Sequence, residues 1–261
     1  MRVTALPLIS AALLTLAGCG SDPAATSGSA SAKPTTTQVA PPVSGSTAAK
    51  SDALPEFTVD ELGPYINGQR PLLKEAGGAE KLTKIISEIN VADKEVPLTV
   101  RPKSKAADVV AVVHELGLAK AKSVQITGST RGDLPGTIVV LPQARVPEAP
   151  GCSVVAMITK SGDADVWWVK GGAARKIGKG ISGVDLTRTG ETMQRELKQC
   201  ASKYAFFSPD EGAEWVTPMM IAGTLVKADA EKKLEAVVLL DAVPTPGKPV
   251  DGIKQTEPPK K

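Results

Sequence analysis

Residues 154–169 read VVAMITKSGDADVWWV, and this stretch decides how the second half of the chain folds. Two apolar runs, 154–159 and 166–169, flank the polar segment Lys160-Ser161-Gly162-Asp163. A short polar segment with a glycine between two such runs is typical of a β-hairpin turn. The sequence therefore predicts two antiparallel strands here, joined by a tight turn.

The chain that follows the hairpin alternates between helical and extended patterns. Met193 and Leu197 have helical spacing, and Thr217-Pro218 is typical of the first residues of a helix. The predicted elements are helix 190–200, strand 204–207, helix 217–228 and strand 236–240.

The preceding half shows the same order of elements, without a hairpin in front. Its predicted elements are helix 79–89, strand 96–100, helix 104–116 capped by Ser104, strand 123–127 and an extra strand at 138–141. Pro102 and Pro209 hold matching places, 107 residues apart (209 − 102). We therefore predict an α+β fold of small mixed β-sheets with helices on one face, in two tandem units, 54–149 and 150–243. The alternative is that the two halves share this order by chance, because many α+β proteins alternate helices and strands in this way.

The amino terminus has the pattern of an export signal. Arg2 precedes a nearly uncharged run at 3–17, which ends in Leu16-Ala17-Gly18-Cys19. This pattern resembles the lipobox of bacterial lipoproteins, which implies a signal peptide at 1–18 and a lipid on Cys19. An ordinary secretory peptide or an uncleaved anchor is the alternative. Because Gly20 rather than Asp follows the cysteine, the same resemblance favours the outer membrane over the inner one.

Two segments have compositions that predict disorder. Residues 19–53 are mostly Ser, Thr, Ala, Pro and Gly, and residues 244–261 are rich in Pro and Lys. Such segments have too little apolar surface to offset the entropy lost on folding. We expect a flexible tether between the lipid and the folded region, and a disordered tail after it.

Charge and motifs exclude several classes of function. The formal net charge is +3 with acids and bases interspersed, so we expect no nucleic-acid partner. His114 is the single histidine, and no nucleophile elbow is present. Gly172 to Gly178 encloses five residues where a phosphate-binding loop needs four. We therefore expect no metal, no cofactor and no enzyme activity.

Cys152 and Cys200 are the two cysteines that remain after lipidation of Cys19. An even pair in an exported protein usually forms a disulfide. That bond would stabilise the fold by roughly 4 kcal/mol on the chain-entropy account. A metal site or a catalytic thiol is the alternative.

Trp167-Trp168 lies in the second strand of the hairpin, where neighbouring side chains point to opposite faces. One ring is therefore expected to pack in the core, and the other to face outward or toward a partner. The candidate partner-binding residues are these two tryptophans and the nearby cations Lys170, Arg175, Lys176 and Lys179. Core packing of both rings is the alternative.

The second half resembles the periplasmic domains of ExbD/TolR proteins. The resemblance rests on the order hairpin-helix-strand-helix-strand, on Thr159-Lys160-Ser161-Gly162-Asp163, and on the stretch GKGISGVDLT at 178–187. It implies a periplasmic domain that dimerises or contacts peptidoglycan or the proteins of an envelope motor or transport complex. The family's membrane helix with its essential aspartate is replaced here by the lipobox signal, so proton conduction is not expected.

These observations together predict a lipid-anchored protein that faces the periplasm. We expect a non-catalytic binding or scaffold module of ExbD/TolR type. The alternatives are a purely structural envelope lipoprotein or an envelope hydrolase.

Overall fold

The computed structural model describes residues 53–146, 152–170, 173–176, 185–200, 203–250 and 253. The predicted signal peptide, the lipidated Cys19 and the tether up to residue 52 lie outside the described residues, as does Lys179. All of the described residues belong to one compact unit of the chain.

The described residues form ten strands, four α-helices and one short 3₁₀ helix. The strands are β1 Phe57–Asp60, β2 Gly63–Ile66, β3 Glu95–Val100, β4 Ser123–Thr127, β5 Thr137–Pro142, β6 Cys152–Ile158, β7 Ala164–Lys170, β8 Ala173–Lys176, β9 Tyr204–Ser208 and β10 Ala236–Leu239. The helices are α1 Gly78–Ser87, α2 Ala106–Leu118, η1 Gln143–Arg145, α3 Leu186–Gln199 and α4 Val216–Ala228.

All ten strands belong to one mixed sheet, in the order β2-β1-β3-β4-β5-β10-β9-β6-β7-β8. The α+β class with a mixed sheet is therefore confirmed. The predicted hairpin is present, since β6 and β7 pair antiparallel from Cys152–Lys170 to Ile158–Ala164. Gly162 takes a φ of 80° in its turn, which a residue with a Cβ adopts only at a cost. The halves share a single sheet because β5 pairs with both β4 and β10.

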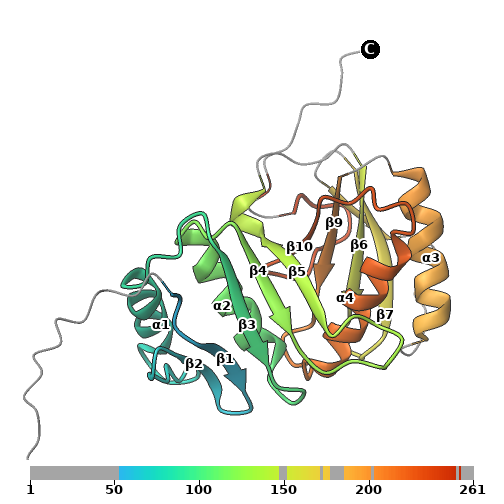
Figure 1. The fold of residues 1–261 in the computed structure, drawn as a ribbon. Helices are drawn as coiled ribbons and strands as arrows, with labels where there is room; N and C mark the ends of the chain where they lie inside the picture. The colour runs from blue at the N-terminus through green and yellow to red at the C-terminus, as the bar shows by residue number, and fades with distance from the viewer. Residues whose placement is uncertain are drawn as a thin grey trace, which may run out of the picture. The chain divides into compact units, whose positions relative to one another are not determined.

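The two halves have matching topologies. The β1–β2 hairpin, which the sequence reasoning missed, gives the first half the order β2-β1-β3-β4, and the second half has β7-β6-β9-β10. The segments that precede α2 and α4 contact each other: Ala106 N–H donates to Ala213 O, and Trp215 N–H donates to Ser104 O. α1 and α2 lie at one end of the sheet, and α3 and α4 at the other (Figure 1). Tandem duplication of one unit stays a prediction.

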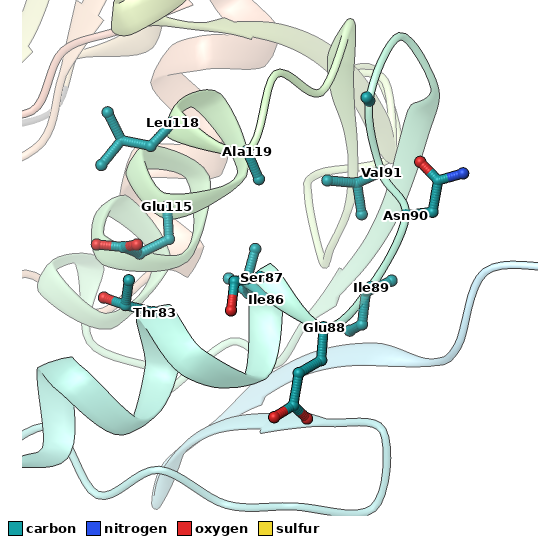
Figure 2. Close-up of a pocket in the computed structure, with 11 residues that line it drawn as sticks. Thr83, Ile86, Ser87, Glu88, Ile89, Asn90, Val91, Glu115, Leu118 and Ala119 are labelled. Atoms are coloured by element: carbon teal, nitrogen blue, oxygen red, sulfur yellow. The ribbon is translucent and has the colours of Figure 1, made fainter.

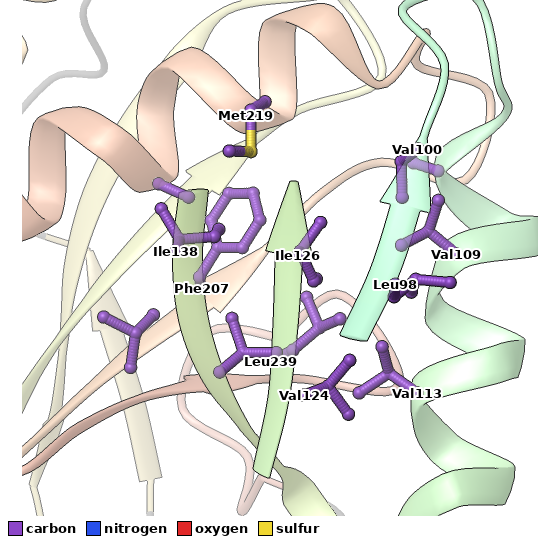
Figure 3. Close-up of a cluster of buried hydrophobic side chains, with 14 of the residues drawn as sticks. Leu98, Val100, Val109, Val113, Val124, Ile126, Ile138, Phe207, Met219 and Leu239 are labelled. Atoms are coloured by element: carbon purple, nitrogen blue, oxygen red, sulfur yellow. The ribbon is translucent and has the colours of Figure 1, made fainter. Parts of the chain in front are cut away.

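The main core lies between one face of the sheet and the four helices, as predicted. Side chains of α2 and α4 reach this face from the same side, and Val109 and Met219 lie against the strands there (Figure 3). Apolar residues alternate along the strands, so Val96, Leu98 and Val100 all face the helices and are buried. This burial is the largest favourable contribution to folding.

The opposite face of the sheet differs between the two halves. In the first half it faces solvent, and the residues of β3 that point there are Glu95, Pro97 and Thr99. In the second half Val250 and Ile253 cover it and are 5% and 6% exposed. Both residues belong to the tail 244–261, of which the structure describes 244–250 and 253. Their packing on the sheet is a long-range contact, which the composition of the tail does not indicate.

Two helix starts differ from the predicted ones. Ser104 does not cap α2; its hydroxyl donates to Val59 O and is buried. α3 begins at Leu186, where Asp185 accepts a hydrogen bond from the backbone N–H of Arg188. Asp185 is a favourable cap for α3, because its carboxylate accepts a backbone N–H group and also interacts favourably with the helix dipole.

Candidate functional site

Trp167 and Trp168 point to opposite faces of the sheet, as the alternation of a strand requires. Trp167 is 6% exposed and packs in the cluster that Val250 and Ile253 complete. Contact between Trp167 and a partner would require this cluster to open, because Val250 and Ile253 cover the face to which Trp167 points. Partner binding by Trp167 stays a prediction.

Trp168 is partly buried on the helix side, beside α3. Its indole N–H donates to Glu196 at 3.1 Å, and Lys170 Nζ lies 4.7 Å from the centre of its ring. Arg175 of β8 is exposed and pairs with Trp168 in the sheet. The structure thus brings Trp168, Lys170 and Arg175 together, and we call these three residues the Trp168 surface. The side chain of Lys176 lies outside the described residues.

The disulfide between Cys152 and Cys200 is present in the structure. It joins the first residue of β6 to the residue at the end of α3, 48 positions later. Neither sulfur is therefore free to act as a nucleophile or a metal ligand. The bond fixes α3 against the sheet.

The largest cavity among those described is a groove of about 850 Å³ beside α2, which we call the α2 groove. Its walls come from the start of α1 and the loop before it, one side of α2, the loop after β9 and the chain after β10. Apolar side chains line most of it, namely Leu73, Ala79, Leu82, Ala107, Val110, Ala111, Pro209, Ala242 and Val243. Its charged or ionisable residues are Lys74, Lys105, Asp108, His114, Glu115, Glu211 and Asp241.

His114 and Asp241 form an ion-pair contact at one end of the α2 groove. Nδ1 of His114 lies 2.9 Å from Oδ2 of Asp241, although the two atoms are not aligned for a hydrogen bond. A histidine held by a carboxylate can activate a nucleophile. However, none of the described residues that line the groove carries a hydroxyl or thiol.

Asp108, in the first turn of α2, is only 8% exposed, although it lines the groove. Burial raises the pKa of its carboxyl group above the usual value, and the nearby charges of Lys74 and Lys105 oppose this shift. The dominant effect is removal of the carboxylate from water, which disfavours the charged form.

Two further pockets lie between the ends of paired helices. One, of about 570 Å³, lies between the C-terminal ends of α1 and α2, where Thr83 and Glu115 line it (Figure 2). The other, of about 340 Å³, lies between the ends of α3 and α4. In this second pocket Asp229 is paired, because both its carboxylate oxygens accept backbone N–H groups. Neither pocket combines deep burial with an unpaired charge.

The sequence reasoning missed the α2 groove. Asp108 has the sequence position of an ordinary first-turn acid, and it is buried in the folded chain, where Gly63 lies beside it. His114 was noted only as the single histidine, and Asp241, which it contacts, comes from the other half of the chain. The apolar residues Ala107, Val110 and Ala111, which lie outside the buried positions of α2, were the signal that could have indicated a second, partly covered face.

Within the described ranges, no three residues of the metal-ligating types come together as a metal site, and no helix there is long and apolar enough to cross a membrane. No family model matches the sequence, and no curated protein or solved structure matches the chain.

Proposed function

We propose that this chain is a non-catalytic binding module of the bacterial cell envelope, of ExbD/TolR type. In this proposal the lipid on Cys19 holds the protein to a membrane, the outer membrane in preference to the inner, and the folded region faces the periplasm. Its partner is peptidoglycan or a protein of an envelope transport complex.

The observation that carries the proposal is the α2 groove. Its lining is mostly apolar with charges of both signs, and the described part has a histidine–carboxylate pair without a hydroxyl or thiol beside it. Concave, mostly apolar sites with a few convergent polar groups are typical ligand sites. The elements on which the family resemblance rests, a hairpin followed by helix, strand, helix and strand, occur in this order over residues 152–239, with β8 added between the hairpin and the first helix.

The test is co-sedimentation of the full chain, in detergent, with purified peptidoglycan sacculi. Ala111→Phe fills the groove, since Ala111 lines it, while Leu118→Phe adds the same ring to an exposed position of α2 outside it. We expect pelleting of the wild type and of Leu118→Phe, and its loss in Ala111→Phe. A wild-type chain that stays in the supernatant would contradict peptidoglycan binding.

The Trp168 surface provides the second arm of the same experiment. A triple variant with Trp168→Ala, Lys170→Ala and Arg175→Ala removes its ring and both cations. Pelleting that this variant loses and Ala111→Phe retains would place the contact on the Trp168 surface instead of the groove.

The lipid is tested separately, because Cys19→Ala should release the protein from the membrane fraction. A chain that stays with the membranes as Cys19→Ala would contradict the anchor.

A further inference from the structure

Asp108 is the most unusual charged residue of the α2 groove. It is 8% exposed, and no hydrogen bond or ion pair to its carboxylate is found among the described residues. Lys105, three residues earlier, donates instead to Gly212 O at 3.4 Å. Neither carboxylate oxygen is among the fully buried polar atoms without a partner, so the carboxylate keeps access to the groove. An unpaired carboxylate on a residue with so little exposure, in a concave site, is a candidate for binding a ligand.

The surroundings of Asp108 restrict the chemistry of that ligand. On one side, Oδ2 faces the backbone of β2: a Cβ built on Gly63 would lie 3.9 Å from it. A planar guanidinium needs both carboxylate oxygens for its paired hydrogen bonds, whereas a compact ammonium can use one. The approach of β2 beside Oδ2 leaves less room for a planar guanidinium than for a compact ammonium, so we consider the ammonium.

The rest of the groove fits an aliphatic arm that carries such a group. Leu82, Val110 and Ala111 offer apolar surface next to Asp108. The groove lining has more carboxylates than cationic groups. Its carboxylates are Asp108, Glu115, Glu211 and Asp241, whereas its basic residues are Lys74, Lys105 and His114. A cationic ligand with methylene groups complements both properties.

We propose that the α2 groove binds the primary ammonium group of a lysine or other diamino-acid side chain within a peptide, with the Asp108 carboxylate as its counter-ion. This inference rests on the proposed binding function and names the part of the partner that the groove recognises. No bond is made or broken in the interaction. Because the bound cation favours the charged carboxylate, binding releases a proton from the fraction of molecules in which Asp108 is protonated.

The test uses the full chain in detergent and three blocked tripeptides of sequence Ala-X-Ala, where X is lysine, acetyl-lysine or norleucine. Nuclear magnetic resonance measures the binding. We expect binding of the lysine peptide alone. Asp108→Asn should weaken it at least tenfold, whereas Glu88→Gln, an exposed change outside the groove, should leave it unchanged.

Equal affinity of wild type and Asp108→Asn for the lysine peptide would overturn the inference, as would the absence of binding to the wild type. Asp108→Asn keeps the size of the side chain, and near-ultraviolet circular dichroism checks that it is folded. Sacculi separate this inference from the proposed function. If Asp108→Asn still pellets with them as the wild type does, the binding function stands and the ammonium site is wrong.

Discussion

The guanidinium of Arg70 donates hydrogen bonds of 2.6 and 2.7 Å to the two carboxylate oxygens of Asp60. It also donates to Gly63 O at 3.1 Å, so one side chain holds both strands of the β1–β2 hairpin. Gly63 of this hairpin lies next to Asp108, which lines the α2 groove. The Asp60–Arg70 pair therefore supports the part of the chain that packs beside Asp108.

Asp60→Asn should destabilise the protein by about 1 kcal/mol at neutral pH, because it replaces a partly buried bidentate ion pair. The hydrogen bond from Arg70 lowers the pKa of Asp60, so the folded state favours the charged form. The stabilisation is present above the unfolded pKa, about 3.9, and is lost as the pH falls through the lower folded value. Urea denaturation at several pH values measures the difference between wild type and variant, which should shrink below pH 4.

Glu61→Gln is the matched control, because Glu61 is exposed in the turn next to Asp60. Its stability should follow the wild type throughout the pH series. A constant difference between wild type and Asp60→Asn down to pH 2 would contradict a role for the charge of Asp60.

Removal of the disulfide with Cys152→Ala and Cys200→Ala should cost roughly 4 kcal/mol, since the bond closes a long loop in the unfolded chain. Urea denaturation of the oxidised wild type and of the double variant gives this value. A reducing agent should destabilise the wild type to a similar degree and leave the double variant unchanged. If reduction has no effect on the wild type, the bond is not formed in solution.

Asp108→Asn should stabilise the folded protein at neutral pH, although it removes the proposed ammonium site. Burial raises the pKa of Asp108, so the folded state holds its proton more tightly than the unfolded chain. The contribution of Asp108 to stability is full below the unfolded pKa and is lost as the pH rises through the folded value. Thermal unfolding of wild type and variant should therefore coincide near pH 3 and diverge toward pH 7. A variant that is less stable at pH 7 would indicate a stabilising partner for the charge.

Local patterns predicted most of the elements of this fold. The spacing of Leu82, Ile85 and Ile86 predicted α1, and the alternation at 96–100 predicted β3, because each element buries one face. β1 and β2 were missed because each has only four residues, and Pro64 lies within β2. Their pairing depends on partners such as Thr99, which pairs with Thr58 from far along the chain.

The candidate site depends almost entirely on such long-range packing. The single sheet exists because Val140 of β5 pairs with both Val124 and Val237, and no local pattern specifies this junction. The pairing of His114 with Asp241 is a consequence of the same junction. In contrast, the disulfide could be predicted, because the two cysteines after Cys19 leave one pairing and the amino-terminal pattern predicts export. Local sequence patterns therefore did not predict the contacts between the two halves of the chain.

Gly117→Ala should destabilise the protein by about 1–3 kcal/mol, because α2 packs too closely for a methyl group there. A Cβ on Gly117 would lie 2.6 Å from Cβ of Pro142, and the rigid proline ring cannot move aside. The helix would have to shift away from the end of β5, and this strain exceeds the gain of up to about 1 kcal/mol that alanine brings to a helix. Gly223→Ala in α4 is the matched control, since its nearest neighbour, Cδ of Pro135, would lie at an ordinary 3.4 Å. Urea denaturation should show a loss for Gly117→Ala and no loss for Gly223→Ala. If both variants gain stability alike, the close contact between α2 and Pro142 does not exist in solution.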